Sequence, residues 1–289
     1  MPATNYYTKV FIALFIMLST CLLAKPKNVE ITYIANEGFL IEIDTNKVLI
    51  DALFGHQELS FCEVPDSVQL AMMTKGTGIF EDIDLIAATH NHRDHFHAPF
   101  VAEHLHHNPT GIFLSCRQAT DALKQETISQ SIASQISTLD VSQRSDTTIG
   151  GIHITALPLP HSPYYIRDEK TGEQYNKHRK IQNLGYLIDI NGIRLFHSGD
   201  SSPAFFKAFE RYQLQDEKID IALLARGFLA TPENVEFTRR FINPDHIILM
   251  HLHPDRQQYF RDIAGKLSDI FPSIHIFSYP MEKRLYKIP

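Results

Sequence analysis

Short apolar runs separated by polar, turn-forming residues recur along the whole chain. Alternation of apolar and polar positions predicts strands at 30–35 and 39–51, with a turn at 45–47 that gives a hairpin. Helical spacing predicts helices at 98–107, 117–126, 202–212, 231–242 and 255–270. Further strands are expected at 83–88, 111–115, 151–158, 184–190, 192–197, 220–224, 246–250 and 274–278. Strands and helices in alternation indicate a layered α/β domain.

Two stretches lack this periodicity. Residues 54–80 are rich in Gly, Ser and Met and exceed ordinary connection lengths, so we expect an irregular segment there. Its apolar side chains either form a lid or, more simply, pack in the core. Residues 163–183 are polar and aperiodic, which predicts an exposed insertion. Its basic and tyrosine side chains could receive an anionic leaving group, although a solvated loop is the simpler interpretation.

The first 24 residues differ from the rest of the chain. Lys9 is their only charged residue, and the largely apolar run 10–24 is typical of a signal-peptide core but short for a membrane span. The stretch that ends at Cys21 resembles a bacterial lipobox, which would acylate Cys21 and attach the chain to a membrane. Cleavage after Ala24 and an uncleaved anchor are the alternatives. All three predict that residues 25–289, as one domain, are exported to the periplasm or cell envelope.

The composition of the chain limits the kinds of ligand and partner that it is expected to bind. The chain has 289 residues, 44% of them hydrophobic, and a net charge of −6, so it can bury a core but has no general attraction for nucleic acid. We therefore expect a small-molecule substrate and no nucleic-acid partner. Beyond Cys21 only Cys62 and Cys116 remain, without a Cys-x-x-Cys pair. They are expected to be separate buried thiols and cannot form a thiolate zinc site.

Candidate chemistry concentrates in the ten residues 88–97, which directly follow the apolar run 83–88. His90 and His92 lie two apart in an extended segment and project to the same side, and Asp94 and His95 follow in a turn. Imidazole nitrogen and carboxylate oxygen are ligands of divalent metals. The loop therefore offers two ligand pairs. Other histidines in the chain follow from composition, and those on the next helix are expected to be solvated: His104, His106 and His107.

Three more apolar runs end at a residue of the same kind: His161, Asp200 and His251. In a layered α/β domain the loops at one rim of the sheets lie together. Four strand ends that bring histidine and aspartate to one rim predict a dinuclear metal site. His253 competes with His251 for the last position, because residues two apart point to the same side.

The order His90-x-His92-x-Asp94-His95, then His161, Asp200 and His251, resembles the metallo-β-lactamase superfamily from about Ile31 to Tyr279. Details such as Pro158-Leu-Pro-His161 and His197-Ser-Gly-Asp200 are most similar to its branch of metal-dependent hydrolases related to L-ascorbate-6-phosphate lactonase. The resemblance implies an αββα sandwich of two facing mixed sheets with outer helices. Antibiotic hydrolases of the best-known type have cysteine at the position of Asp200, so β-lactam cleavage is not expected here.

The resemblance also implies roles for the metal-ligand residues. One ion would be held by His90, His92 and His161, the other by Asp94, His95 and His251, with Asp200 between them. The ions would be zinc or manganese, with iron also compatible with these ligands. Asp94 is in addition the candidate for acid–base catalysis.

The sequence thus predicts an exported dinuclear hydrolase that uses a metal-bridging hydroxide to cleave a small ester, lactone or phosphoester. Two other functions stay open. A mononuclear iron oxygenase on the same fold would need neither His95 nor His251, and an envelope lipoprotein could bind metal without turnover. Two further residues are expected near the ions: His197 as a structural histidine beside Asp200, and Asp51 either orienting the metal loop or capping a turn.

Overall fold

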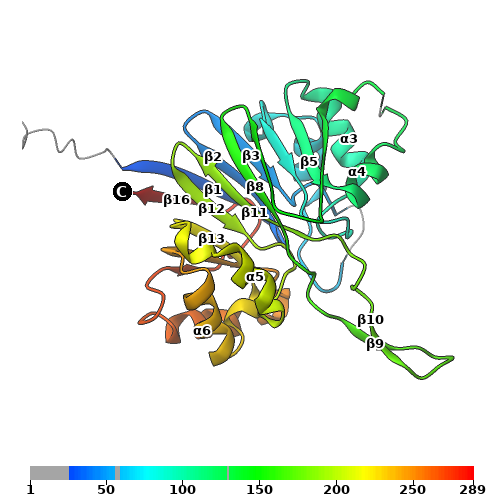
Figure 1. The fold of residues 1–289 in the computed structure, drawn as a ribbon. Coiled ribbons are helices and arrows are strands. Elements are labelled where there is room, and N and C mark those ends of the chain that lie inside the picture. Colours follow the sequence, from blue (N-terminus) through cyan, green and yellow to red (C-terminus); the bar gives the residue numbers. More distant parts are fainter. Residues whose placement is uncertain (1–25, 56–58, 129) are drawn as a thin grey trace, which may run out of the picture.

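A computed structural model describes residues 26–55, 59–128 and 130–289, and in it two seven-stranded mixed sheets face each other (Figure 1). The first sheet has the strand order β16-β1-β2-β3-β4-β5-β6, and the second has the order β15-β14-β13-β12-β11-β8-β7. Helices cover the outer face of each sheet. The expected αββα sandwich is therefore confirmed.

The first sheet is built from both ends of the described chain. Its strands are β1 (Lys27–Ala35), β2 (Gly38–Ile43), β3 (Asn46–Ile50), β4 (Leu85–Ala87), β5 (Ile112–Cys116), β6 (Ile136–Leu139) and β16 (Lys283–Ile288). Strands β3 to β6 are parallel, and β2 is antiparallel to both β1 and β3, so β1 runs in the same direction as β3. The carboxyl ends of β1, β3 and β4 consequently meet at one edge of this sheet.

The second sheet repeats this arrangement. Its strands are β7 (Ser145–Ile149), β8 (Ile152–Pro158), β11 (Leu184–Ile190), β12 (Ile193–His197), β13 (Ile221–Ala225), β14 (His246–Met250) and β15 (Ile274–His275). Strands β12 to β15 are parallel, and β11 is antiparallel to both β8 and β12. The carboxyl ends of β8, β12, β13 and β14 therefore also share an edge.

Two apolar cores hold the layers together. One joins the facing sides of both sheets, with Ile41 of the first and Leu195 of the second fully buried, and extends beneath the helices of the first sheet. The other lies between the second sheet and its helices, where Phe196 and Phe209 are fully buried. The helices are α2 (Ser67–Thr74), α3 (Ala98–His107), α4 (Arg117–Leu123), α5 (Phe206–Tyr212), α6 (Pro232–Phe241) and α7 (Gln257–Lys266).

The aperiodic stretch 54–80 is not wholly irregular, because it contains helix α2. The carboxylate of Asp66 accepts hydrogen bonds from the backbone N–H of Val68 and Gln69, and the Gln69 side chain accepts one from the Asp66 N–H. This capping box starts a helix that buries little of its length, which is why apolar spacing did not predict it. Phe54, Met73 and Phe80 are buried in the core, in line with the simpler interpretation of this stretch.

The insertion 163–183 is exposed as expected, but it forms an arm with a short hairpin, β9 (Tyr165–Arg167) and β10 (Gln174–Asn176). The arm projects away from the sheets (Figure 1). Strands β6, β7 and β16 were likewise not predicted. They lie at or next to the sheet edges, where one face or both stay polar and the apolar pattern is weak.

Two predictions about individual residues had different outcomes. Cys62 and Cys116 are separate buried thiols, as expected. The expectation that His104 is solvated was wrong, because this side chain is fully buried and its Nδ1 donates to the carbonyl oxygen of Met73 in α2. His106 and His107 are exposed.

The predicted leader, 1–24 with Cys21, lies outside the described residues. Within the part of the chain that the structure does describe, every helix is too short or too polar to span a bilayer.

Candidate metal centre

All seven predicted metal-ligand residues come together where the carboxyl-terminal edges of the two sheets meet. The loop after β4 carries His90, His92, Asp94 and His95, and the ends of β8, β12 and β14 lead to the other three: His161, Asp200 and His251. The segments that follow β8 and β12 are paired through their backbones here, because His161 forms an isolated bridge with Ser201.

The first group of ligand atoms surrounds one oxygen of Asp200. Its Oδ2 lies 3.0 Å from Nε2 of His161 and 3.8 Å from Nε2 of His90. Nδ1 of His92 lies 3.1 Å from Nε2 of His161. One ligand atom from each of these four residues lies within 4.8 Å of all the others, which is compatible with a single ion between them.

The second group surrounds the other oxygen of Asp200. Its Oδ1 lies 3.4 Å from Nε2 of His251 and 3.7 Å from Nε2 of His95. Oδ2 of Asp94 lies 3.6 Å from Nε2 of His251 and 3.4 Å from Nε2 of His95. The carboxylate of Asp200 therefore presents a different oxygen to each group, as a ligand shared between two ions does.

The hydrogen bonds of the Nδ1 atoms, which point away from the centre, are compatible with metal binding through Nε2. Nδ1 of His161 donates to the Ser162 carbonyl at 2.9 Å, and Nδ1 of His95 donates to Asp51 at 2.9 Å. Nδ1 of His90 donates to the hydroxyl of Thr89 at 3.0 Å. In the neutral form of each ring the proton is then on Nδ1, and Nε2 carries a free lone pair toward the centre. The Nε2 atoms of His90 and His95 are buried without a hydrogen-bond partner, which is costly unless they bind an ion.

Asp51 positions the loop 88–97, which carries four of the predicted metal-ligand residues. Its carboxylate accepts hydrogen bonds from the backbone N–H of Thr89 at 2.7 Å, from the Thr89 hydroxyl at 2.6 Å and from His95. Asp51 itself has a positive φ of 47°, a conformation that aspartate tolerates better than most residues. Of the two expected roles, orienting the loop is the one that these contacts support.

His197 is a structural histidine, as expected. It is fully buried, its Nε2 donates to the carbonyl oxygen of Glu37, and its Nδ1 accepts from the N–H of Gly199, next to Asp200. Asn36 was not predicted. Its side chain donates to both the backbone and the carboxylate of Asp94.

Glu37 is a second residue that the sequence pattern missed. Its carboxyl group is fully buried 3.8 Å from Nδ1 of His95. Burial and the nearby Asp200 carboxylate raise the pKa of Glu37 well above its ordinary value. A single glutamate in the turn between β1 and β2 does not by itself indicate this contact.

The charge states of His90, His92 and the two aspartates suit a cation. Burial lowers the pKa of His90, and it lowers that of His92 to about 4, so both are neutral at pH 7. Burial acts to raise the pKa of Asp94, but His95 and His251 outweigh it and hold this pKa well below the usual range. The same balance, with His251 first among the opposing groups, lowers the pKa of Asp200. His95 differs: burial acts to lower its pKa, but Asp94 and Asp200 outweigh burial and raise this pKa, so His95 has to release a proton when it binds an ion.

The hydrogen bonding of His251 has to change when an ion binds. Nη1 of Arg226 lies 2.7 Å from its Nδ1 and donates to it, which leaves the imidazole proton on Nε2, facing the carboxylates. An ion on Nε2 requires the proton on Nδ1 instead. His253, the competing candidate, accepts from the N–H of Asp255 and belongs to neither ligand group.

The ligand groups open into a cavity of about 660 Å³, within the range of small-molecule sites. His92, Asp94, His161, Asp200 and His251 form its floor. Its walls include Phe61 and residues from the base of the insertion, among them Tyr164, Lys177 and His178. The ring of His178 packs against that of His161, with centroids 4.1 Å apart. The insertion thus reaches the site, which the sequence left open.

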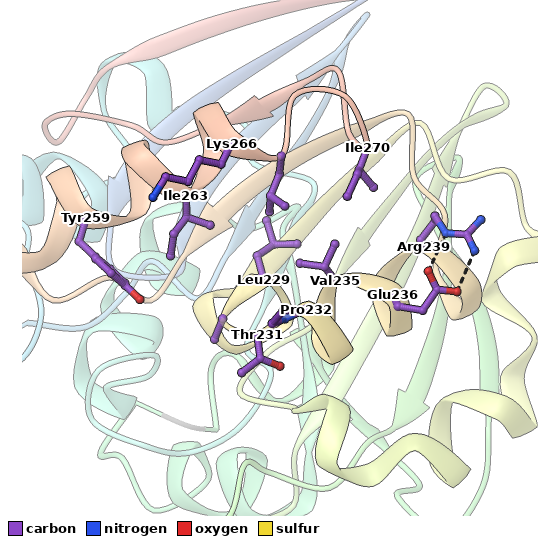
Figure 2. Close-up of a pocket in the computed structure, with 12 residues that line it drawn as sticks. Leu229, Thr231, Pro232, Val235, Glu236, Arg239, Tyr259, Ile263, Lys266 and Ile270 are labelled. Atoms are coloured by element: carbon purple, nitrogen blue, oxygen red, sulfur yellow. Dashed lines mark hydrogen bonds and ion pairs between the residues drawn. The ribbon is translucent and has the colours of Figure 1, made fainter.

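A second cavity, of about 510 Å³, lies between α6 and α7 and differs in character (Figure 2). Apolar side chains such as Leu229, Val235 and Ile263 line it. Its Arg239 and Glu236 pair with each other at 2.7 Å. None of the metal-ligand groups found among the described residues lies in it.

The fold and the site define the class of the protein. Residues 46–233, more than half of the chain, match the family described as the beta-lactamase superfamily domain. The chain therefore belongs to the metallo-β-lactamase superfamily, and the resemblance seen in the sequence is confirmed at that level.

Individual proteins are similar to this chain over most of its length. A protein of Pyrococcus furiosus named a metal-dependent hydrolase is 22% identical over 228 residues, which cover 77% of this chain and 84% of the relative. Among solved structures, the metallo hydrolase Igni18 of Ignicoccus hospitalis has a TM-score of 0.61 at 17% identity, covering 91% of this chain and all of its own. The metallo-β-lactamase fold protein YhfI of Bacillus subtilis has a TM-score of 0.58 at 13% identity, covering 90% of this chain and 100% of its own.

Proposed function

We propose that this protein is a metal-dependent hydrolase that uses two divalent ions to cleave a small ester, lactone or phosphoester. The observation that carries the proposal is the position of Asp200, whose two carboxylate oxygens face two separate groups of ligand atoms. The Pyrococcus furiosus relative, named a metal-dependent hydrolase, supports the same class of reaction.

In this proposal His90, His92 and His161 hold one ion and Asp94, His95 and His251 the other, with Asp200 shared. Ions in such a pair lower the pKa of a water so that it attacks at neutral pH, and they polarise the group to be cleaved. Zinc and manganese both suit a site of imidazole and carboxylate ligands, and iron is also compatible.

Asp94 is the proposed acid–base residue. It is a carboxylate at neutral pH, it lies on the cavity floor, and Asn36 holds it by a side-chain hydrogen bond at 3.3 Å. In this position it can accept a proton from the attacking water and return it to the leaving group. The base of the insertion and Phe61 line the walls of this cavity.

The test combines metal analysis with a substrate screen. Purified protein should contain two zinc or manganese ions per chain and should hydrolyse at least one of three model substrates: 4-nitrophenyl butyrate, a γ-lactone or bis(4-nitrophenyl) phosphate. A chelator should abolish turnover, and added zinc or manganese should restore it. Two bound ions with no hydrolysis of any substrate would favour metal binding without turnover.

The mononuclear iron oxygenase remains as a second candidate. The fold also occurs in an oxygenase, CmlA from Streptomyces venezuelae, with a TM-score of 0.50 at 12% identity, although CmlA is a diiron beta-hydroxylase. That likeness covers 91% of this chain and 54% of CmlA and concerns the fold alone. A mononuclear oxygenase would leave His95 and His251 without an ion, although both face Asp200. One iron per chain and oxygen-dependent turnover would favour it.

Export and lipid attachment through Cys21 also remain proposals, supported by the apolar run 10–24. Labelling of bacterial cells with a palmitate analogue tests both. The wild-type chain should be labelled and a Cys21→Ser variant should not. Unlabelled protein in the periplasm would instead favour ordinary cleavage.

A further inference from the structure

We propose that the substrate carries a negative charge close to the bond that is cleaved, and that Lys177 and Arg93 bind this charge at the rim of the metal cavity. The inference rests on the proposed hydrolytic function and specifies its substrate class. It comes from the distribution of charged side chains around the cavity, which is strongly one-sided.

The charged residues of the cavity fall into two sets. The only acids lining it are Asp94 and Asp200, and both belong to the metal-ligand groups. The cations are Arg93, Lys177 and Arg226, and none of them lies among the ligands. With the two carboxylates engaged by metal ions, the cavity presents only positive charge to a ligand. A concave site with one sign of charge attracts the opposite sign.

None of these three cations has an anionic partner in the described part of the chain, but Arg226 donates hydrogen bonds to His251. The structure gives Arg93 and Lys177 no ion pair, whereas Arg144, Arg194 and Arg239 are each paired with a carboxylate. Arg93 is exposed between the metal-ligand residues His92 and Asp94. Lys177 has only a distant contact, its Nζ lying 6.0 Å from the centre of the Tyr164 ring. Neither cation serves an evident structural purpose.

The backbone beside Lys177 is held firmly in place at the metal centre. Its N–H donates to the Tyr164 carbonyl at 2.8 Å, and the neighbouring His178 donates from Nδ1 to the Ser162 carbonyl at 3.1 Å. The His178 ring packs edge-to-face against that of His161. The insertion therefore holds the backbone of Lys177 at the rim of the cavity.

The rest of the cavity wall fits an apolar group. Phe61 and Tyr164 are 38% and 53% exposed, unusually open for aromatic side chains, and Ile181 lies with them. The preferred substrate is thus an ester or lactone with a carboxylate or phosphate on one side and an apolar portion on the other. A phosphodiester combines the negative charge and the scissile bond in one group.

The test compares anionic and neutral substrates of similar size in metal-loaded protein. Mono-(4-nitrophenyl) glutarate should have a KM about tenfold lower than 4-nitrophenyl butyrate, the effect of one charge-assisted contact. Lys177→Met should raise the KM of the glutarate ester about tenfold, with kcat within twofold and no change for the neutral ester. Arg93→Gln should act in the same direction. Lys170→Met, in the exposed turn of the same arm, is the matched control and should change nothing.

A second readout separates this inference from the proposed function. Inorganic phosphate binding to the metal-loaded protein, measured by calorimetry, requires no turnover. Its affinity should fall about tenfold in Lys177→Met and stay unchanged in Lys170→Met. If no ester is cleaved but phosphate binding shows this difference, the hydrolase proposal fails and the anion site stands. Equal phosphate affinity in wild type, Lys177→Met and Arg93→Gln, or equal KM values for the two esters, would overturn the anion site.

Discussion

At the scale of single residues, the site combines ligands that the sequence predicts with supports that it does not. The seven ligand residues follow a pattern of strand ends, and the structure brings all of them together, although metal binding itself stays a prediction. Asn36, Glu37 and Arg226 gave no signal, because their roles arise only from contacts between segments distant in the sequence. Asp51 is intermediate, since a strand end suggested it but only its three hydrogen bonds decide its role.

Loss of one ligand should disable the centre. We expect His161→Ala to lower hydrolysis at least a thousandfold and to reduce bound metal from two ions toward one per chain, because His161 lies between Asp200 and His92. Elemental analysis and turnover measured on the same sample check this. His153→Ala, an exposed histidine on β8, is the control and should behave as wild type. Retained turnover in metal-loaded His161→Ala protein would exclude the assignment.

Loss of the support beneath the loop should have a smaller effect. Asp51→Asn keeps the size and shape of the side chain and tolerates the positive φ. Its NH₂ group, however, faces the hydrogen-bond donors of Thr89 or His95, so at least one of these hydrogen bonds is lost. We expect metal affinity to fall about 10- to 100-fold, measured by competition with a chromogenic chelator. Asp44→Asn is the matched control, because Asp44 also has positive φ but is exposed in the turn after β2. Equal affinities in the two variants would contradict a role for Asp51.

At the scale of elements, the sequence predicts buried strands and amphipathic helices more accurately than edge strands and short helices that depend on a capping residue. Strands β11 and β14 and helix α3 have the expected bounds, because each carries a strong apolar pattern. Helix α2 depends on the cap at Asp66, and β16 alternates basic residues with Tyr286 and Ile288 at a sheet edge. Such elements take much of their stability from neighbours that are distant in sequence, so a local pattern describes them poorly.

His275 at the end of β15 should make the second sheet sensitive to acid. Burial, aided by Arg284, lowers the pKa of His275 from 6.5 to about 4. As pH falls from 6.5 to 4, the unfolded chain binds this proton before the folded chain does, so stability is lost across that window and unaffected above it. In urea unfolding, His275→Gln should reduce the loss between pH 7 and pH 4 by about 2 kcal/mol. His106→Gln, exposed on α3, should leave the loss unchanged.

At the scale of the whole molecule, alternation of strands and helices was enough to predict the layered class but not the sheet order. The candidate metal centre lies where both sheets meet, with His90 to His95 from the first sheet and the other three predicted ligand residues from the second. Which strand joins which sheet depends on long-range pairing, such as that of β1 with β16, and no local pattern encodes it. The resemblance to a known superfamily supplied what periodicity alone could not.

Bound ions should therefore hold the two sheets together. Removing them with a chelator should lower Tm by about 10 °C, since ions at a thousandfold excess over Kd add about 4 kcal/mol to the native state. Differential scanning calorimetry with and without chelator measures the shift. The same chelator should have almost no effect on an Asp200→Ala variant, whose two ligand groups no longer share a carboxylate. A Tm that chelator leaves unchanged in the wild type would contradict metal binding at this position.

The pairing of β1 with β16 also has a consequence for synthesis of the chain. Strand β1 can pair with β2 soon after both leave the ribosome, yet its other edge waits for a partner about 250 residues later. Throughout that interval the open edge can accept a strand from a neighbouring nascent chain. A chaperone that covers this edge until β16 emerges would therefore raise the yield of folded protein.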